Sequence, residues 1–199
     1  MSKQLTMAKT LFESFYSTVH HRVRVIKDKS FKDVVGKEYE IMRKAFYQHL
    51  GLKASKEKIG NYNADLVVRD PTTDRILIIE EDKGHYVDSC FVKRFLMNAA
   101  ETIEKYIQEG ETVPYFILSS PTSMSNYEKT YSYSSRLFRS EIKKIMDEKI
   151  VYLPYCSHDR VSKKKYYKNT NNCFALEDAL ITKQLEFITK IKQGGNNVV

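Results

Sequence analysis

The sequence predicts an α/β protein whose mixed central β-sheet is flanked by helices. Short aliphatic runs at 66–68 and 76–79 predict two strands, and the polar, proline-containing segment 70–74 predicts a turn between them. Further strands are separated by segments with apolar residues at helical spacing. Because such an order requires crossover connections, we expect a sheet covered by helices on both faces.

The elements around this hairpin follow from the same patterns. Amphipathic helices are expected over 4–20 and 31–50, and a third helix is expected to end at Gly110, a residue suited to a helix C-terminus. The strand at 76–79 has no polar alternation, so both of its faces should be covered. The remaining expected elements are a strand at 114–119, a helix at about 125–148, a strand at 150–154 and a helix at 175–191.

A single domain is the simplest organisation for the 199 residues, with a core at about 31–156 and helical extensions at 1–30 and 157–199. The net charge of +8 favours contact with a polyanion. No apolar run is long enough to span a membrane and no secretion signal is apparent, so we expect a soluble intracellular protein. The three cysteines lack Cys-x-x-Cys spacing, which argues against zinc or a disulfide framework.

Three ionisable residues at the ends of the hairpin strands form the first candidate site. Alternation along a strand places Glu81 and Lys83 on one face, and Asp65 begins the neighbouring strand. Two carboxylates suit a hard divalent cation, and a nearby ammonium can orient or deprotonate a nucleophilic water. A hairpin with a solvated charged end is the alternative interpretation of the same residues.

The helix at 31–50 contributes a further candidate. Glu38 lies within a stripe of apolar residues that includes Ile41 and Met42. A carboxylate in such a stripe is costly unless it is paired, neutralised or bound to a metal. Glu40 is expected on the opposite, solvated face, among Lys37, Arg43 and Lys44. Glu38 could alternatively extend to the end of the helix or bond a buried tyrosine.

The order and spacing of Glu38, Asp65, Glu81 and Lys83 resemble the PD-(D/E)XK nuclease superfamily, over roughly 31–156. The resemblance implies a restriction-endonuclease-like core. It also implies that Asp65 and Glu81 bind Mg²⁺, or Mn²⁺ in its place, that Lys83 contacts the attacking water, and that Glu38 supports the metal site. Ala64 stands where that family usually has proline before the aspartate, a replacement the family often tolerates.

A basic segment near the C-terminus predicts contact with nucleic acid. It contains Lys163, Lys164 and Lys165 beside Tyr166, and basic residues interleaved with aromatics can neutralise phosphates and stack on bases. His85, two residues past Lys83, is a further candidate for contact with the scissile phosphate. A solvated surface loop is the alternative interpretation of the basic segment.

Together these observations predict a Mg²⁺-dependent nuclease, with DNA as the expected substrate and endonucleolytic cleavage as the expected reaction. One competing hypothesis is a catalytically inactive member of the same fold that binds nucleic acid or another partner. The other is an unrelated basic α/β binding protein, in which Glu38 would lie away from Asp65. A homodimer and a monomer both remain open, since cleavage of two strands usually needs two active sites.

Overall fold

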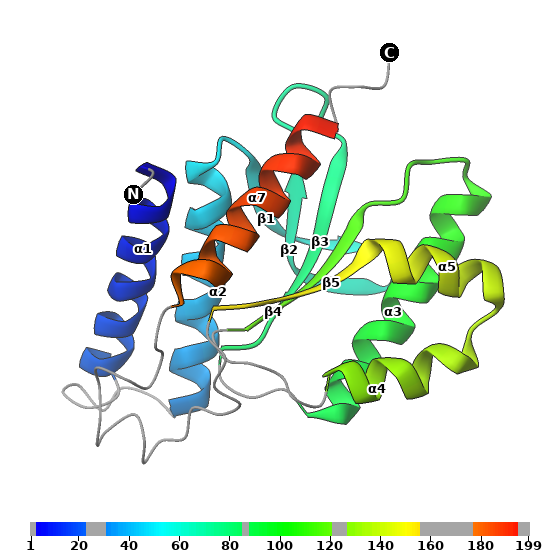
Figure 1. The fold of residues 1–199 in the computed structure, drawn as a ribbon, viewed down its shortest axis with the longest axis horizontal. Helices are drawn as coiled ribbons and strands as arrows, with labels where there is room; N and C mark the ends of the chain where they lie inside the picture. The colour runs from blue at the N-terminus through cyan, green and yellow to red at the C-terminus, as the bar shows by residue number, and fades with distance from the viewer. Residues whose placement is uncertain (1–2, 23–30, 85–87, 121–126, 156–176, 195–199) are drawn as a thin grey trace.

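The computed structural model describes residues 3–22, 31–84, 88–120, 127–155 and 177–194. Five strands form one mixed sheet in the order β1-β2-β3-β4-β5 (Figure 1). The first three strands pair antiparallel, and β3, β4 and β5 pair parallel. The strands are β1 (Lys53–Ile59), β2 (Tyr62–Arg69), β3 (Ile76–Asp82), β4 (Tyr115–Ser120) and β5 (Ile150–Pro154). The predicted α/β class with a mixed sheet is therefore confirmed.

Helices cover both faces of the sheet, and each face has its own apolar core (Figure 1). One face packs against α1 (Lys3–His20), α2 (Phe31–His49) and α7 (Asp178–Gly194). The other packs against α3 (Ser89–Gln108), α4 (Tyr127–Ser134) and α5 (Ser140–Lys149). The central strand β3 is consequently buried from both sides, as its continuous aliphatic run predicts.

Local turn chemistry explains the hairpin between β2 and β3. The Asp70 carboxylate accepts hydrogen bonds from the Thr72 and Thr73 backbone N–H groups at 2.8 and 2.9 Å, and Asp74 completes the turn with a φ of 59°. An aspartate that bonds the backbone two residues on is typical of such turns. Gly110 has a φ of 68° just after α3, which confirms the predicted helix end.

The helix expected at about 125–148 is instead divided. Its first part is α4, continued by a short 3₁₀ turn, η2 (Ser135–Leu137), and its second part is α5. Phe138 separates the parts with an extended backbone at φ −97° and ψ 152°. No helix among the described residues has the length and apolar character needed to cross a membrane.

The buried face of α2 differs from the stripe that the sequence predicts. Arg43, expected among solvated charges, is fully buried, whereas Ile41, expected in the stripe, is 53% exposed. Tyr39 and Tyr47 also face inward. The apolar periodicity misplaced this face because Arg43 finds a buried carboxylate partner, Glu80, on the central strand.

Candidate active site

Asp65 lies at an irregularity in the pairing of β1 with β2. Ser55 pairs with Val67 and Glu57 pairs with Ala64, so the two residues Asp65 and Leu66 oppose the single residue Lys56. Such a bulge re-aims a side chain and is common beside active sites. Asp65 Oδ2 accepts a hydrogen bond from the Asp82 backbone N–H at 2.9 Å, and this fixes its carboxylate against the end of β3.

Glu81 brings a second carboxylate to the same place. Burial raises its pKa to about 8, and the neighbouring Asp65 carboxylate raises it in the same direction. The Tyr62 hydroxyl and the Lys83 ammonium act against this rise. Two crowded carboxylates, one of them partly deprived of water, resist carrying two negative charges together. A cation would relieve that repulsion.

Lys83 projects over an aromatic ring at the start of α3. Its Nζ lies 4.1 Å from the centroid of the Phe91 ring, a position that favours a cation over the ring face. Phe91 is held in turn because its backbone N–H donates to the N-capping Asp88 carboxylate at 2.8 Å. The structure thus brings Asp65, Glu81 and Lys83 to the C-terminal end of β3.

The opposite face of the same strand end is buried and polar. Arg43 donates from Nε to Glu80 Oε1 at 2.6 Å and from Nη2 to Glu80 Oε2 at 2.9 Å, and both side chains have no exposed surface. Asp82 is also buried, and neither of its carboxylate oxygens has a hydrogen-bond partner among the described residues. Burial and then the Glu80 carboxylate hold the pKa of Asp82 well above its usual range, which favours the neutral acid.

The two glutamates of α2 are not placed as expected. Glu38 is largely buried and forms an ion pair with Arg22 of the chain just after α1. Glu40, expected in solvent near Lys44, instead accepts from Lys56 Nζ at 3.3 Å, and the same ammonium lies 3.6 Å from Asp65 Oδ1. Glu40 is thus connected to the site through Lys56, whereas Glu38 is engaged by Arg22. Periodicity does not predict such pairings, because they depend on how β1 and α1 pack against α2.

The end of β3 approaches α2 very closely. A Cβ atom added at Gly84 would lie 2.6 Å from the Val35 carbonyl oxygen, so a side chain at this position would require the helix to move. Lys83 follows the strand directly, and its backbone N–H donates to the Ser119 carbonyl at 2.9 Å. Gly84 and this hydrogen bond hold the segment that carries Lys83 against β4 and α2.

A polar hollow lies beside the carboxylate pair, between the turn from β1 to β2 and α3. It has a volume of about 310 Å³ and shares the wall residue Tyr62 with the site. The Tyr62 hydroxyl is buried beside the Glu81 carboxylate, and burial followed by the Glu81 charge raises its pKa. The other lining residues are Ile59, Gly60, Asn61, Asn98, Glu101, Thr102 and Lys105.

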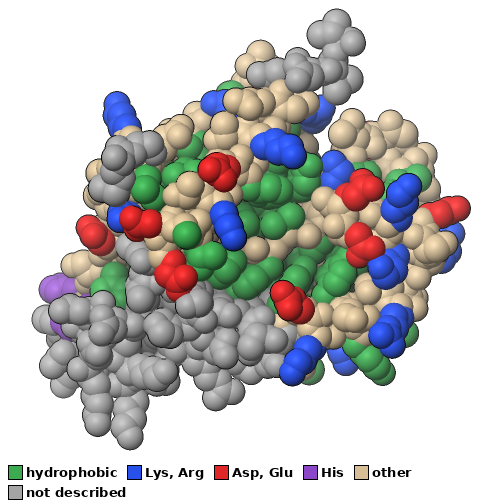
Figure 2. Space-filling model, in the orientation of Figure 1, with side chains coloured by type: hydrophobic (Ala, Val, Ile, Leu, Met, Phe, Trp, Pro, Cys, Tyr) green, Lys and Arg blue, Asp and Glu red, His purple; other side chains and the backbone are tan. Residues whose placement is uncertain are grey.

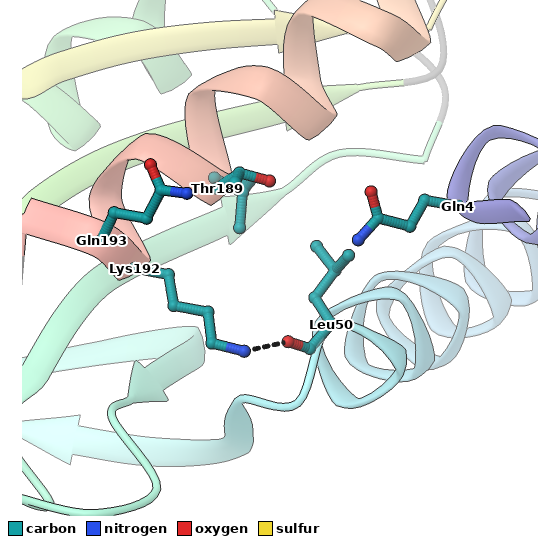
Figure 3. Close-up of a pocket in the computed structure, with 6 residues that line it drawn as sticks. Gln4, Leu50, Thr189, Lys192 and Gln193 are labelled. Atoms are coloured by element: carbon teal, nitrogen blue, oxygen red, sulfur yellow. Dashed lines mark hydrogen bonds between the residues drawn. The ribbon is translucent and has the colours of Figure 1, made fainter. Parts of the chain in front are cut away.

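A second hollow shares no lining residue with the first (Figure 3). It has a volume of about 250 Å³ between the ends of α2 and α7 and the start of α1. Lys192 donates to the Leu50 carbonyl oxygen at 2.8 Å and so caps the end of α2. No carboxylate occurs among the described residues that line this hollow, so it has no donor set for a divalent cation.

Some of the predicted site residues cannot be placed. His85 and the basic residues Lys163, Lys164, Lys165 and Tyr166 lie outside the described residues. Within the described part of the chain, no group of three or more His, Cys, Asp and Glu side chains could hold a metal ion. Asp65 and Glu81 therefore form a pair that Glu38 does not complete in this conformation.

Comparison with known proteins gives no match. No family model matches the chain, and neither a curated sequence nor a solved structure matches it. The residues at the end of β3 are therefore the basis for inferring the function.

Proposed function

We propose that this protein is a metal-dependent nuclease with a restriction-endonuclease-like core, acting on nucleic acid with DNA as the expected substrate. The observation that carries the proposal is the paired Asp65 and Glu81 carboxylates, which lie on neighbouring strands with Lys83 beside them. The mixed sheet, with helices on both of its faces, is compatible with that core.

The residues at this position fit a hard divalent cation such as Mg²⁺, with Mn²⁺ as a substitute. Asp65 and Glu81 would hold it, because two carboxylates plus substrate phosphate and water are the ligands that Mg²⁺ prefers. Burial, together with the neighbouring Asp65 carboxylate, raises the pKa of Glu81 to about 8, and a bound cation would favour its ionised form. When bound, such an ion acidifies a coordinated water and offsets negative charge on the phosphoryl oxygens.

The chain's own residues would orient the substrate. Lys83 presents a single ammonium group beside the carboxylates, and its contact with the Phe91 ring favours this position. An ammonium in this position can hold a water or a phosphate oxygen by hydrogen bonds. Glu38 would support the site only after releasing Arg22, so its contribution to cleavage should be smaller than that of Asp65.

Cleavage of labelled DNA in the presence of Mg²⁺ or Mn²⁺ tests the proposal. Wild-type protein should cut, and addition of EDTA should stop it. Asp65→Ala or Glu81→Ala should abolish cutting and leave binding of the DNA largely intact, because contacts to the phosphate backbone survive. Undiminished cleavage by either variant would refute the site. Glu38→Gln should cut more slowly than wild type but faster than Asp65→Ala.

A second candidate is a catalytically inactive protein of the same fold that binds nucleic acid. The observation that favours it is the ion pair between Glu38 and Arg22, which occupies the carboxylate expected to complete the site. Metal titration separates the two candidates. The inactive protein would bind nucleic acid with equal affinity with and without Mg²⁺ and would not cut under any metal condition.

A further inference from the structure

The outer surface next to Lys83 combines cations with an exposed aromatic ring. Arg94 of α3 lies over the same Phe91 ring as Lys83, with its guanidinium carbon 5.3 Å from the ring centroid. The preceding residue, Lys93, places Nζ 5.6 Å from the centroid of the Tyr133 ring on α4. A path of cationic and aromatic groups therefore runs from the carboxylate pair across α3 to α4.

Tyr133 is unusual among the aromatic residues of this path because 66% of its surface is exposed. Tyr127 and Tyr131, on the same helix, stack on each other with ring centroids 5.8 Å apart and are partly buried. Tyr133 has no such aromatic neighbour among the described residues. A large exposed ring in contact with a cation is a surface on which a nucleic-acid base can stack.

Several cations lie near this ring, and its helix also carries the exposed carboxylate Glu128. Lys129 lies one helical turn before Tyr133, and Arg136 lies three residues after it, both exposed. Among the described residues, no carboxylate forms an ion pair with Lys93, Arg94, Lys129 or Arg136. Lys and Arg side chains lie along the lower right edge in Figure 2, with Asp and Glu side chains between some of them. This face is complementary to a phosphate backbone.

We propose that the surface formed by Lys93, Arg94, Lys129, Tyr133 and Arg136 binds single-stranded nucleic acid and leads the strand to Asp65 and Glu81. The cations contact successive phosphates, and Tyr133 stacks on an unpaired base. A base within a duplex has its faces covered by its neighbours, so stacking on Tyr133 selects single strands, flaps or frayed ends. This inference rests on the proposed nuclease function and specifies its substrate class.

Fluorescence anisotropy without divalent metal tests the inference independently of cleavage. A labelled single-stranded oligonucleotide and the duplex of the same sequence are titrated with wild-type protein, Tyr133→Ala, Tyr133→Phe and the control Leu137→Ala. Leu137 is 79% exposed and lies one turn from Tyr133. Loss of one stacked base should weaken single-strand binding by about 5- to 100-fold in Tyr133→Ala. Tyr133→Phe and Leu137→Ala should stay within about twofold of wild type.

Duplex binding distinguishes stacking from charge. Tyr133→Ala should leave the affinity for the duplex unchanged, whereas Arg94→Ala should weaken binding to both forms and reduce the salt dependence. Equal losses on single strand and duplex for Tyr133→Ala, or no loss on either, would overturn the inference. These titrations contain no metal, so their outcome does not depend on whether the wild-type protein cuts DNA. Failure of the nuclease proposal can therefore be distinguished from failure of the single-strand binding proposal.

Discussion

At the scale of single residues, Glu81 combines burial with a charged neighbour. Its pKa of about 8 means that the folded, metal-free protein retains a proton that the unfolded chain releases near pH 4.5. Between these values the folded state binds more protons, so its stability falls as pH rises. The pKa of Asp82 is raised as well, so Asp82 adds to the same pH dependence. The contribution of Glu81 is therefore measured by comparing the wild-type protein with a Glu81 variant.

We expect Glu81→Gln to stabilise the metal-free protein at pH 8 and to flatten this pH dependence between pH 5 and 8. Since one pKa unit corresponds to about 1.4 kcal/mol, the gain should be on the order of 4 kcal/mol at pH 8 and near zero at pH 4. Urea unfolding at several pH values, in the presence of EDTA, measures this difference in the free energy of unfolding. Exposed Glu128→Gln is the control, and parallel curves for wild type and Glu81→Gln would contradict the assignment.

Arg43 shows what residue patterns could not predict. Its charge indicated a solvated face of α2, yet it donates to Glu80, Tyr47, Tyr155 and Gln184 inside the core. Five donors in a fixed plane allow one guanidinium to meet several partners from distant parts of the chain. Hydrophobic periodicity contains no information on such partners, and this explains the error in the buried face of α2.

Arg43→Met should destabilise the protein by about 3–5 kcal/mol, because it leaves Glu80 buried without a counter-charge. The neighbouring exposed residue offers a matched control, and Lys44→Met should change stability by less than about 0.5 kcal/mol. Urea denaturation of both variants measures their free energies of unfolding. The double variant Arg43→Met with Glu80→Leu should recover part of the loss, and a small effect of Arg43→Met alone would show that the pair does not stabilise the fold.

At the scale of elements, strand alternation predicted the site better than helix periodicity did. The hairpin, its turn and the common face of Glu81 and Lys83 depend on local patterns that the sequence contains. The bulge at Asp65 is not evident in the sequence, because it arises only when β1 pairs with β2. The bulge places Lys56 opposite Asp65, so an ammonium competes for the carboxylate that we assign to the metal.

Lys56→Met should therefore tighten metal binding. The ion pair is solvent-exposed and weak, on the order of 0.2–1 kcal/mol, so the gain in Mn²⁺ affinity should be at most about fivefold. Lys58→Met is the matched control, since Lys58 is exposed two residues along the same strand and has no resolved ion pair among the described residues. Calorimetric titration with Mn²⁺ measures the affinity of both variants. Weaker Mn²⁺ binding by Lys56→Met would contradict competition between the Lys56 ammonium and the metal for Asp65.

At the scale of the whole molecule, the sheet separates two different environments. One face carries the buried network of Arg43 and Glu80, and the other carries Glu81 and Lys83 beside α3. The sequence predicted the α/β class and the mixed sheet because alternation of strand and helix patterns largely determines them. It did not predict the divided helix at 127–149, nor the ion pair that engages Glu38, since both depend on packing between distant segments.

In the proposed site, Asp65 and Glu81 together would hold one divalent cation. Mn²⁺ binding followed by electron paramagnetic resonance tests it directly, with wild-type protein, Asp65→Asn, Glu81→Gln and the exposed control Glu128→Gln. Loss of a carboxylate ligand should weaken Mn²⁺ binding by at least about tenfold in each site variant and leave the control unchanged. Absence of Mn²⁺ binding by the wild-type protein, or binding by Asp65→Asn and Glu81→Gln as tight as that of wild type, would contradict this metal site.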